Sequence, residues 1–226
     1  MMKTTLLFPT PLWTLNKVGC TKEPLLEFIR HVQKEDPNGR ISSNEGGWQS
    51  WDFMEDICDT NPLKELKDII MRHAYAVCDE WSFKDYSLKM TNLWINVNKK
   101  GNYNIVHTHP GSVLSGVYYV DLPKCCHGPL TFLKPFEQIH LKEAWGCNAN
   151  FNRAHHNDYN DDELDHYPEE DDLLFFPSWL MHRVHQNSSD EDRISISFNI
   201  SAYSRHYYGI YPSEGNNTKR TPIKVK

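Results

Sequence analysis

The segment RISISFNISAY, residues 193–203, decides the fold class because polar and apolar residues alternate along it. Successive side chains of an extended strand point to opposite faces, so this period of two is typical of a strand with one buried face. The segment MTNLWINVN, residues 90–98, shows the same period, with Leu93, Ile95 and Val97 expected on one face. Both segments therefore predict β-strands.

Further short strands are expected between these two. They are predicted at VLSGVYYVDLP (113–123), PLTFL (129–133) and DLLFFP (172–177), which turn residues separate and no helical pattern interrupts. Short strands joined by turns favour an antiparallel sandwich or jelly roll over a parallel α/β sheet. We therefore expect a mainly β jelly-roll core over residues 86–205.

The first 85 residues are predicted to be helical, with loops. Leu25 and Ile29 recur at helical spacing before a stop signal at Pro37. A second helix is predicted over residues 62–80, where a proline occupies the first turn and apolar residues follow on one face. We expect these N-terminal helices to pack on one sheet of the core.

Length and composition predict a single domain over residues 1–226. The chain has 39% hydrophobic and 24% charged residues, and it shows no repeat and no compositional break. Residues 136–171 form an acidic, Asn-rich stretch that is expected to be a long loop, and residues 206–226 are expected to be a polar tail. Loops of such length are usually functional, so this one is a candidate lid.

Charge and cysteine usage restrict the partners and the compartment. Lys and Arg total 24 against 30 Asp and Glu, and the net charge of −6 argues against broad nucleic-acid binding. No apolar run reaches the ~18 residues that a membrane span needs, and prolines interrupt the apolar N-terminal stretch, unlike a signal peptide. The six cysteines lack CxxC spacing, and the adjacent Cys125 and Cys126 are a poor disulfide pair. We expect free thiols and a cytoplasmic protein, while a homodimer stays open.

Three histidines are candidates for a metal site. His107 and His109 lie two residues apart at the end of an extended segment, so both imidazoles are predicted to reach one centre. His182 follows a predicted strand much later in the chain. Two ligands from one strand and a third from a distant strand give facial coordination with open positions, and imidazole suits Fe(II), Zn(II), Cu or Ni. The histidines alone therefore predict a metal without choosing it.

Arg193 is the candidate anion anchor. Its planar guanidinium pairs bidentately with a carboxylate and does not lose its charge. Buried at the inner end of a barrel with no protein carboxylate nearby, it would be costly unless an anion bound there. Ser195 points the same way and offers a second hydrogen bond. Taken singly, each of these residues has an ordinary structural interpretation, and only their combination favours a functional site.

Other polar and aromatic residues are weaker candidates. His185 lies three residues after His182 and is expected on the opposite face of the strand. Trp94 shares a predicted face with Asn96 and is a candidate pocket residue. A cluster in the acidic stretch suggests a second metal site, for which a solvated loop is the favoured interpretation. Its members are His155, His156, His166, Asp158, Asp161 and Asp162.

Three motifs together resemble the iron(II)- and 2-oxoglutarate-dependent oxygenases known mainly from bacteria and phages. They are HTHPGSVLSGVYYV (107–120), FPSWLMHRV (176–184) and RISISFN (193–199), and GGWQS (46–50) is similar to the N-terminal pattern of that family. The likeness covers roughly residues 6–205. It implies a double-stranded β-helix, which is a cupin-like jelly roll with N-terminal helices.

The resemblance also implies an activity and its cofactors. The expected enzyme is a dioxygenase that uses Fe(II), 2-oxoglutarate and O2, with ascorbate as a candidate reductant. It would hydroxylate a peptidyl, amino-acid or small-molecule substrate in a bacterial cell or a phage-infected host. His107 matches the first metal ligand and His182 the distal ligand, while Arg193 and Ser195 match the anchor for the far carboxylate of 2-oxoglutarate. Positions matched to the rest of the co-substrate pocket are Asn96 and Tyr119, or Tyr118 in its place.

His109 departs from the family pattern, which has a carboxylate at that position. The favoured interpretation makes His109 the third ligand of a three-histidine site. Alternatively, His109 is an outer residue and water or chloride is the third ligand, or Asp121 or a loop carboxylate reaches the metal. An imidazole in place of a carboxylate raises the net charge of the metal centre by one and alters its metal preference.

Two other functions stay open at this point. One is a three-histidine jelly-roll metalloenzyme that does not use 2-oxoglutarate, either a dioxygenase or a Zn-dependent hydrolase. The other is a non-catalytic module on the same fold that binds a sugar or a peptide. In the first alternative, metal content and activity would survive replacement of Arg193 by alanine. In the second, the purified protein would contain no bound metal.

Overall fold

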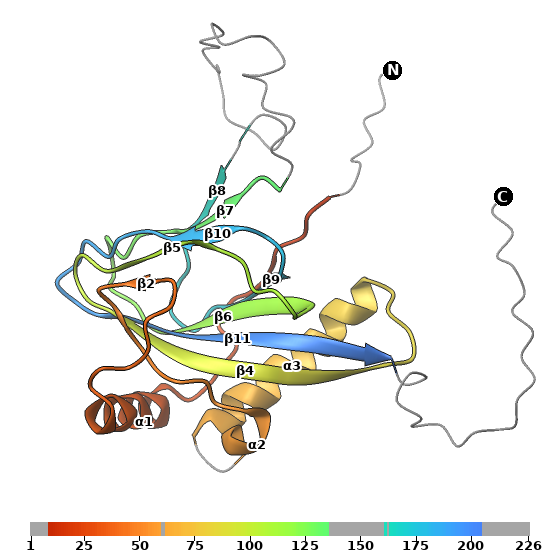
Figure 1. The fold of residues 1–226 in the computed structure, drawn as a ribbon, viewed down its shortest axis with the longest axis horizontal. Helices are drawn as coiled ribbons and strands as arrows, with labels where there is room; N and C mark the ends of the chain where they lie inside the picture. Colours follow the sequence, from red (N-terminus) through yellow and green to blue (C-terminus); the bar gives the residue numbers. More distant parts are fainter. Residues whose placement is uncertain (1–8, 60–61, 136–160, 162, 205–226) are drawn as a thin grey trace, which may run out of the picture.

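The computed structural model describes residues 9–59, 62–135, 161 and 163–204. These residues form one antiparallel sheet of six strands and one of five, which lie one above the other in Figure 1. The helices cover the face of the six-stranded sheet that points away from the five-stranded sheet (Figure 1).

The chain crosses repeatedly between the two sheets. The six-stranded sheet has the order β1-β9-β6-β11-β4-β3, with strands Trp13–Leu15, Leu173–Pro177, Leu114–Asp121, Arg193–Ser204, Tyr86–Asn98 and Trp48–Gln49. The five-stranded sheet has the order β2-β5-β10-β7-β8, with strands Asn44–Glu45, Tyr103–His107, His182–Val184, Leu130–Leu133 and Glu163–His166. This alternation confirms the predicted mainly β jelly roll.

Strands β4 and β11 are the two longest strands of the six-stranded sheet. They pair antiparallel from Arg193 opposite Asn98 to Ser204 opposite Tyr86. The apolar residues of the alternating pattern, such as Ile95, lie in the core beneath the sheet. The polar face of the same strands therefore lies toward the five-stranded sheet, where a site can form.

Strand β6 lacks the alternation because both of its faces are buried. Tyr118 and Val120 belong to the core on the helical side, whereas Val117 and Tyr119 belong to the core between the sheets. A strand covered on both faces needs apolar side chains at successive positions.

Three helices pack against the six-stranded sheet, and the two long ones were predicted. They are α1 (Lys22–Glu35), α2 (Glu55–Cys58) and α3 (Leu63–Glu80). Leu25 and Ile29 of α1 and Ile70 of α3 are buried in the core that they share with this sheet. None of the described helices has the length and apolar character to cross a membrane.

The N-terminal part is less purely helical than predicted. Strands β1, β2 and β3 extend the edges of both sheets, and they pair with β9, β5 and β4 respectively. Each has only two or three residues, too few to show a period of two in the sequence. Their conformation comes from pairing with strands that lie far away in the chain.

The acidic stretch 136–171 is not a loop throughout. Residues 163–166 form β8, which pairs antiparallel with β7, and Thr131 Oγ1 donates a hydrogen bond of 2.5 Å to Asp165 across the pair. Glu163 and Asp165 make this strand polar, so the sequence lacks the apolar residues from which the other strands were predicted. The rest of the predicted loop over 136–160, with His155, His156 and Asp158, lies outside the described residues, as do Asp162 and the tail 206–226.

Candidate active site

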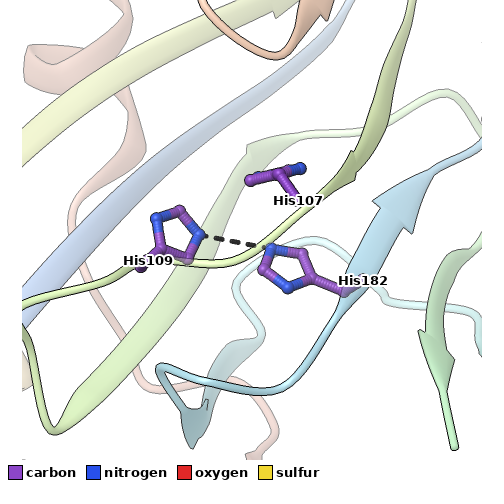
Figure 2. Close-up of side chains that lie close together, drawn as sticks. All are labelled: His107, His109 and His182. Carbon is purple, nitrogen blue, oxygen red and sulfur yellow. Dashed lines mark hydrogen bonds between the residues drawn. The ribbon is translucent and has the colours of Figure 1, made fainter. Parts of the chain in front are cut away.

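The five-stranded sheet brings the three candidate histidines together. His107 is the last residue of β5, His182 is the first residue of β10, and the two are paired across the sheet. His109 follows β5, and one ring nitrogen from each of the three residues lies within 4.8 Å of the others. Figure 2 shows the three rings gathered around one point, with His109 and His182 facing each other. Three converging nitrogens form a donor set for a transition metal.

His109 reaches the cluster by a different route from the one predicted. Strand β5 ends at His107, so strand alternation does not orient His109. Instead, the backbone N–H of His109 donates to Ser178 O at 2.9 Å, on the loop after β9. The imidazole then lies beside Trp94 and Phe176, with ring centroids 5.5 and 6.5 Å away.

Backbone carbonyls fix the tautomers of two of the histidines. His107 Nδ1 lies 2.7 Å from Ile105 O, and His182 Nδ1 lies 2.9 Å from Leu180 O. A carbonyl oxygen only accepts, so both Nδ1 atoms carry the proton and both Nε2 atoms keep a lone pair. The Nε2 atoms of His109 and His182 are 3.2 Å apart (Figure 2). These lone pairs are therefore available on the side where the rings converge, as a metal requires.

Burial keeps the imidazoles uncharged. Burial, and after it the neighbouring His107, lowers the pKa of His182 to about 3 and that of His109 to about 4. Burial also lowers the pKa of His107. A metal binds the neutral imidazole, so the cluster is in its ligand form at neutral pH.

Arg193 is a buried cation with a free donor. Its side chain is 3% exposed, and Nη1 donates to the carbonyls of His127 and His185 at 2.6 and 3.0 Å. Nη2 is buried without a hydrogen-bond partner, and no carboxylate forms an ion pair with Arg193 among the residues that the structure describes. Burial lowers its pKa to about 10, so the group stays charged at neutral pH. An incompletely satisfied buried cation favours an anionic ligand.

One pocket between the sheets joins the histidines to Arg193. It is lined by every residue that sequence analysis selected for the site, which are Asn96, His107, His109, Tyr119, His182, Arg193 and Ser195. Trp94 lines it as well. Three imidazoles at one end and a guanidinium at the other fit a metal and a dicarboxylate that spans the distance between them.

The structure decides between several alternatives of the sequence analysis. Tyr118 faces the helices and donates a hydrogen bond to Asp171, so Tyr119 is the tyrosine of the pocket. His185 lies outside the cluster and accepts a hydrogen bond from Arg183. Asp121 forms an ion pair with Lys22 at 2.8 Å and does not line the pocket, which argues against it as a metal ligand.

The protein family described as "Putative 2OG-Fe(II) oxygenase" matches residues 92–199. The match runs from β4 to β11 and contains all three histidines and Arg193. This segment, just under half of the chain, is similar to the 2OG-Fe(II) oxygenase family. This protein is therefore an enzyme of the dioxygenase class whose cofactors are Fe(II) and 2-oxoglutarate. Among curated proteins, none matches this sequence.

Several solved structures share the fold of this chain. One is a prolyl hydroxylase from Trichoplax adhaerens in complex with a hypoxia inducible factor peptide fragment. It has a TM-score of 0.54 at 16% identity, and the alignment covers 87% of this chain and 86% of the hydroxylase chain. The epimerase SnoN from nogalamycin biosynthesis has a TM-score of 0.57 at 14% identity, over 96% and 91% of the two chains. HygX from Streptomyces hygroscopicus, solved with nickel and 2-oxoglutarate, has a TM-score of 0.55 at 11% identity, over 85% and 83%. At such low identity, the likeness shows the double-stranded β-helix fold alone.

A chain of polar side chains on the wall of the oxygenase pocket was not predicted from the sequence. Asn98 Nδ2 donates to Asn104 Oδ1 at 3.2 Å, and Asn104 Nδ2 donates to Ser43 Oγ at 3.2 Å. Ser43 Oγ lies 3.5 Å from His107 Nε2. Asn98 continues the polar alternation of Asn96 and could have been found, whereas Ser43 comes from an N-terminal loop with no recognisable motif.

A second groove shares the lining residues His107 and His109 with this pocket. Its remaining lining comes from the N-terminal loop, from β3, β4, β5 and β11, and from the residue that follows β5. These residues are Arg40, Ser42, Ser43, Gln49, Asn92, Trp94, Ile105, Thr108 and Asn199. The N-terminal residues of this groove were not predicted as site residues. Most of these side chains are uncharged hydrogen-bonding groups, and Arg40 forms an ion pair with Asp52 at 3.1 Å.

Proposed function

We propose that this oxygenase hydroxylates a peptidyl, amino-acid or small-molecule substrate, with His107, His109 and His182 as iron ligands and Arg193 as the anchor of 2-oxoglutarate. The observation that carries the proposal is the single pocket that joins three converging imidazoles to a buried guanidinium with an unpaired donor. A dicarboxylate that ligates the metal at one end needs a cation at the other end, and Arg193 supplies it.

Each residue of the pocket has a distinct task in this proposal. Arg193 Nη2 and the Ser195 hydroxyl donate hydrogen bonds to the far carboxylate, while the backbone carbonyls of His127 and His185 keep the guanidinium in place. The buried Tyr119 ring closes the pocket from the side of β6 and excludes water. Iron(II) with 2-oxoglutarate would supply the redox chemistry, by which one oxygen atom of O2 enters succinate and the other enters the hydroxylated substrate.

His109 is the third iron ligand in this proposal. Its ring nitrogen already lies 3.2 Å from the ligand nitrogen of His182, and Asp121, the alternative carboxylate, is held by Lys22. Three neutral imidazoles leave the full charge of the metal ion uncompensated by the protein, so the two carboxylates of 2-oxoglutarate provide the balancing charge.

The substrate is proposed to bind in the second groove, beside His107 and His109. The uncharged amide and hydroxyl side chains there suit a substrate with many hydrogen-bonding groups, such as a peptide or an amino acid. Arg193 lines the first pocket and not this groove, so a substrate bound in the groove leaves the anchor free for the co-substrate.

The compartment and remaining partners are also proposals. We place the enzyme in the cytoplasm of a bacterial cell or a phage-infected host, because free thiols are typical of a reducing compartment. The free cysteines among the described residues are Cys20, Cys58, Cys78, Cys125 and Cys126. Apart from 2-oxoglutarate, O2 and its substrate, the acidic chain is not proposed to bind nucleic acid.

Titration calorimetry of 2-oxoglutarate into nickel-loaded protein tests the anchor. We expect Arg193→Ala to weaken binding about 100-fold, which corresponds to the loss of charge-assisted hydrogen bonds worth roughly 3 kcal/mol. Arg193→Lys keeps the charge but loses the planar fork, and should bind with intermediate affinity. Arg183→Ala, which removes a partly exposed arginine paired with Glu163, is the matched control.

Nickel affinity is measured in each variant to show that the metal site has folded. Unchanged 2-oxoglutarate affinity in a folded Arg193→Ala protein would refute the anchor and favour a three-histidine enzyme without this co-substrate. A wild-type protein that binds no metal would favour the binding module. Succinate release with Fe(II) and ascorbate, measured over a panel of peptides and free amino acids, then identifies the substrate class.

A further inference from the structure

Cys125 and Cys126 are adjacent exposed thiols in the turn between β6 and β7. Both are free, and their Sγ atoms lie 3.2 Å apart. The remaining free cysteines of the described residues are buried, and burial raises the pKa of Cys20 to about 12 and those of Cys58 and Cys78 to about 11. An oxidant in solution therefore meets the adjacent pair first among these thiols, since accessibility and thiolate formation control cysteine reactivity.

The same turn holds the 2-oxoglutarate anchor in place. The carbonyl of His127, the next residue, accepts the 2.6 Å hydrogen bond from Arg193 Nη1. The carbonyl of Cys126 accepts a hydrogen bond of 2.8 Å from Ser188 N, in the loop between β10 and β11. Hydrogen bonds thus connect the backbone of this turn to the side chain of Arg193 and to the loop that precedes β11.

The turn is tightly fitted and conformationally demanding. Cys126 has a φ of +67°, in the left-handed region that residues other than glycine rarely adopt. Gly128, with a φ of +74°, lies so close to the β10–β11 loop that a Cβ atom would come within 2.7 Å of Gln186 O. A conformation of this kind persists only while its surroundings hold it, so a covalent change in the turn is transmitted to its neighbours.

We propose that Cys125 and Cys126 are a reversible oxidation site, at which a peroxide forms a disulfide between the two residues and thereby loosens the Arg193 anchor. In the first step one thiolate attacks the peroxide, the O–O bond breaks, and a sulfenic acid forms with release of water or alcohol. In the second step the other thiol attacks the sulfenic sulfur, the S–O bond breaks, the S–S bond forms and one water molecule leaves. The two sulfurs are oxidised by two electrons in total, and the peroxide is reduced by two.

Geometry explains why the disulfide would move the turn. Consecutive Cα atoms are about 3.8 Å apart across a trans peptide bond, whereas a relaxed disulfide needs about 4.4–6.8 Å. The backbone around Cys126 must therefore change, and the carbonyls of Cys126 and His127 are the nearest groups to be displaced. The same strain makes the bond easy to reduce, so a pair that is unsuited to a structural disulfide is suited to a reversible one.

The test combines intact mass with 2-oxoglutarate binding in nickel-loaded protein, since nickel avoids reaction of iron with peroxide. A Cys147→Ser background removes the one cysteine that lies outside the described residues. The neighbouring Cys126 thiol raises the pKa of Cys125, so oxidation is run at about pH 8 to increase the thiolate fraction.

We expect the loss of two hydrogens, mapped by peptide analysis to residues 125 and 126. The dissociation constant of 2-oxoglutarate should rise about tenfold, as for loss of one hydrogen bond to a charged group, and dithiothreitol should restore it.

Cys125→Ser and Cys126→Ser are the matched controls, and both should keep their 2-oxoglutarate affinity after peroxide treatment. Sulfonic acids or intermolecular dimers without an intrachain disulfide would overturn the oxidation site. A mapped disulfide with unchanged affinity would overturn its coupling to Arg193. The affinity measurement rests on the proposed function, whereas the mass measurement does not. If the reduced protein fails to bind 2-oxoglutarate, the proposed function is wrong, and the mass measurement still tests the oxidation site.

Discussion

His109 determines the charge of the proposed metal centre. The related pattern has a carboxylate at this position, which neutralises part of the metal charge, whereas a neutral imidazole neutralises none. Imidazole also suits a broader range of transition metals than carboxylate does. Because its position rests on a backbone hydrogen bond to Ser178 and on packing beside Trp94, the ring can be removed without breaking a strand.

His109→Ala is expected to weaken nickel binding by more than about 100-fold, beyond the roughly 10–100-fold that is typical for loss of an outer partner of a ligand. Equilibrium dialysis measures the affinity, and Thr108→Ala, at the adjacent position of the chain, is the control. His109→Asp should restore binding and shift the preference from nickel toward Fe(II), since carboxylate oxygen is a harder ligand. A loss of only a few-fold in His109→Ala would favour the alternative in which water or chloride is the third ligand.

At the scale of elements, strand β6 connects the helical core to the pocket. It lies between β9 and β11, and its two faces contribute to two separate cores. Gly116 allows this close packing, because a Cβ atom there would lie 2.2 Å from Phe198 Cζ and 2.3 Å from Leu174 O. The glycine also lines the pocket, so its small size matters for both packing and site.

Gly116→Ala is expected to lower the free energy of unfolding by about 2 kcal/mol or more, because the aromatic ring and a strand carbonyl must both move. Denaturation by guanidinium chloride measures the change. Lys89→Ala, at an exposed position of β4 in the same sheet, is the control and should stay within about 0.5 kcal/mol of the wild type. Equal stability of Gly116→Ala and wild type would contradict the packing derived for β6.

At the scale of the whole molecule, the proposed site lies between the two sheets. His107 and His182 belong to the five-stranded sheet, whereas Tyr119 and Arg193 belong to the six-stranded sheet. A metal bound by the histidines strengthens one sheet, and 2-oxoglutarate then connects that sheet to the other. Binding should therefore stabilise the fold in two separate steps.

Nickel and then 2-oxoglutarate are each expected to raise the melting temperature of the protein. At a free ligand concentration of about 100 times Kd, each step adds roughly 2.7 kcal/mol to the free energy of unfolding. Differential scanning fluorimetry measures both increments. Arg193→Ala should keep the nickel increment and lose the 2-oxoglutarate increment, and the persistence of both in that variant would contradict the proposed connection between the sheets.

Local patterns in the sequence were sufficient for the jelly roll, for the two long helices and for the candidate histidines and arginine, whereas Asn96 and Tyr119 were selected through the family resemblance. The alternation in β4 and β11 and the helical spacing in α3 repeat within a few residues, so they can be read without knowing any distant contact. The types of residue were equally informative, since imidazoles and an arginine limit what a pocket can bind.

Only the tertiary structure decided which residues complete the site and its surroundings. Pairing with distant strands created β1, β2, β3 and β8, and packing on both faces of β6 selected Tyr119 over Tyr118. The same long-range contacts brought Ser43 to the histidines and left Nη2 of Arg193 buried without a partner. The physical reason is that burial and hydrogen-bond partners depend on contacts between residues far apart in the chain, and such contacts leave no periodic signal in the sequence.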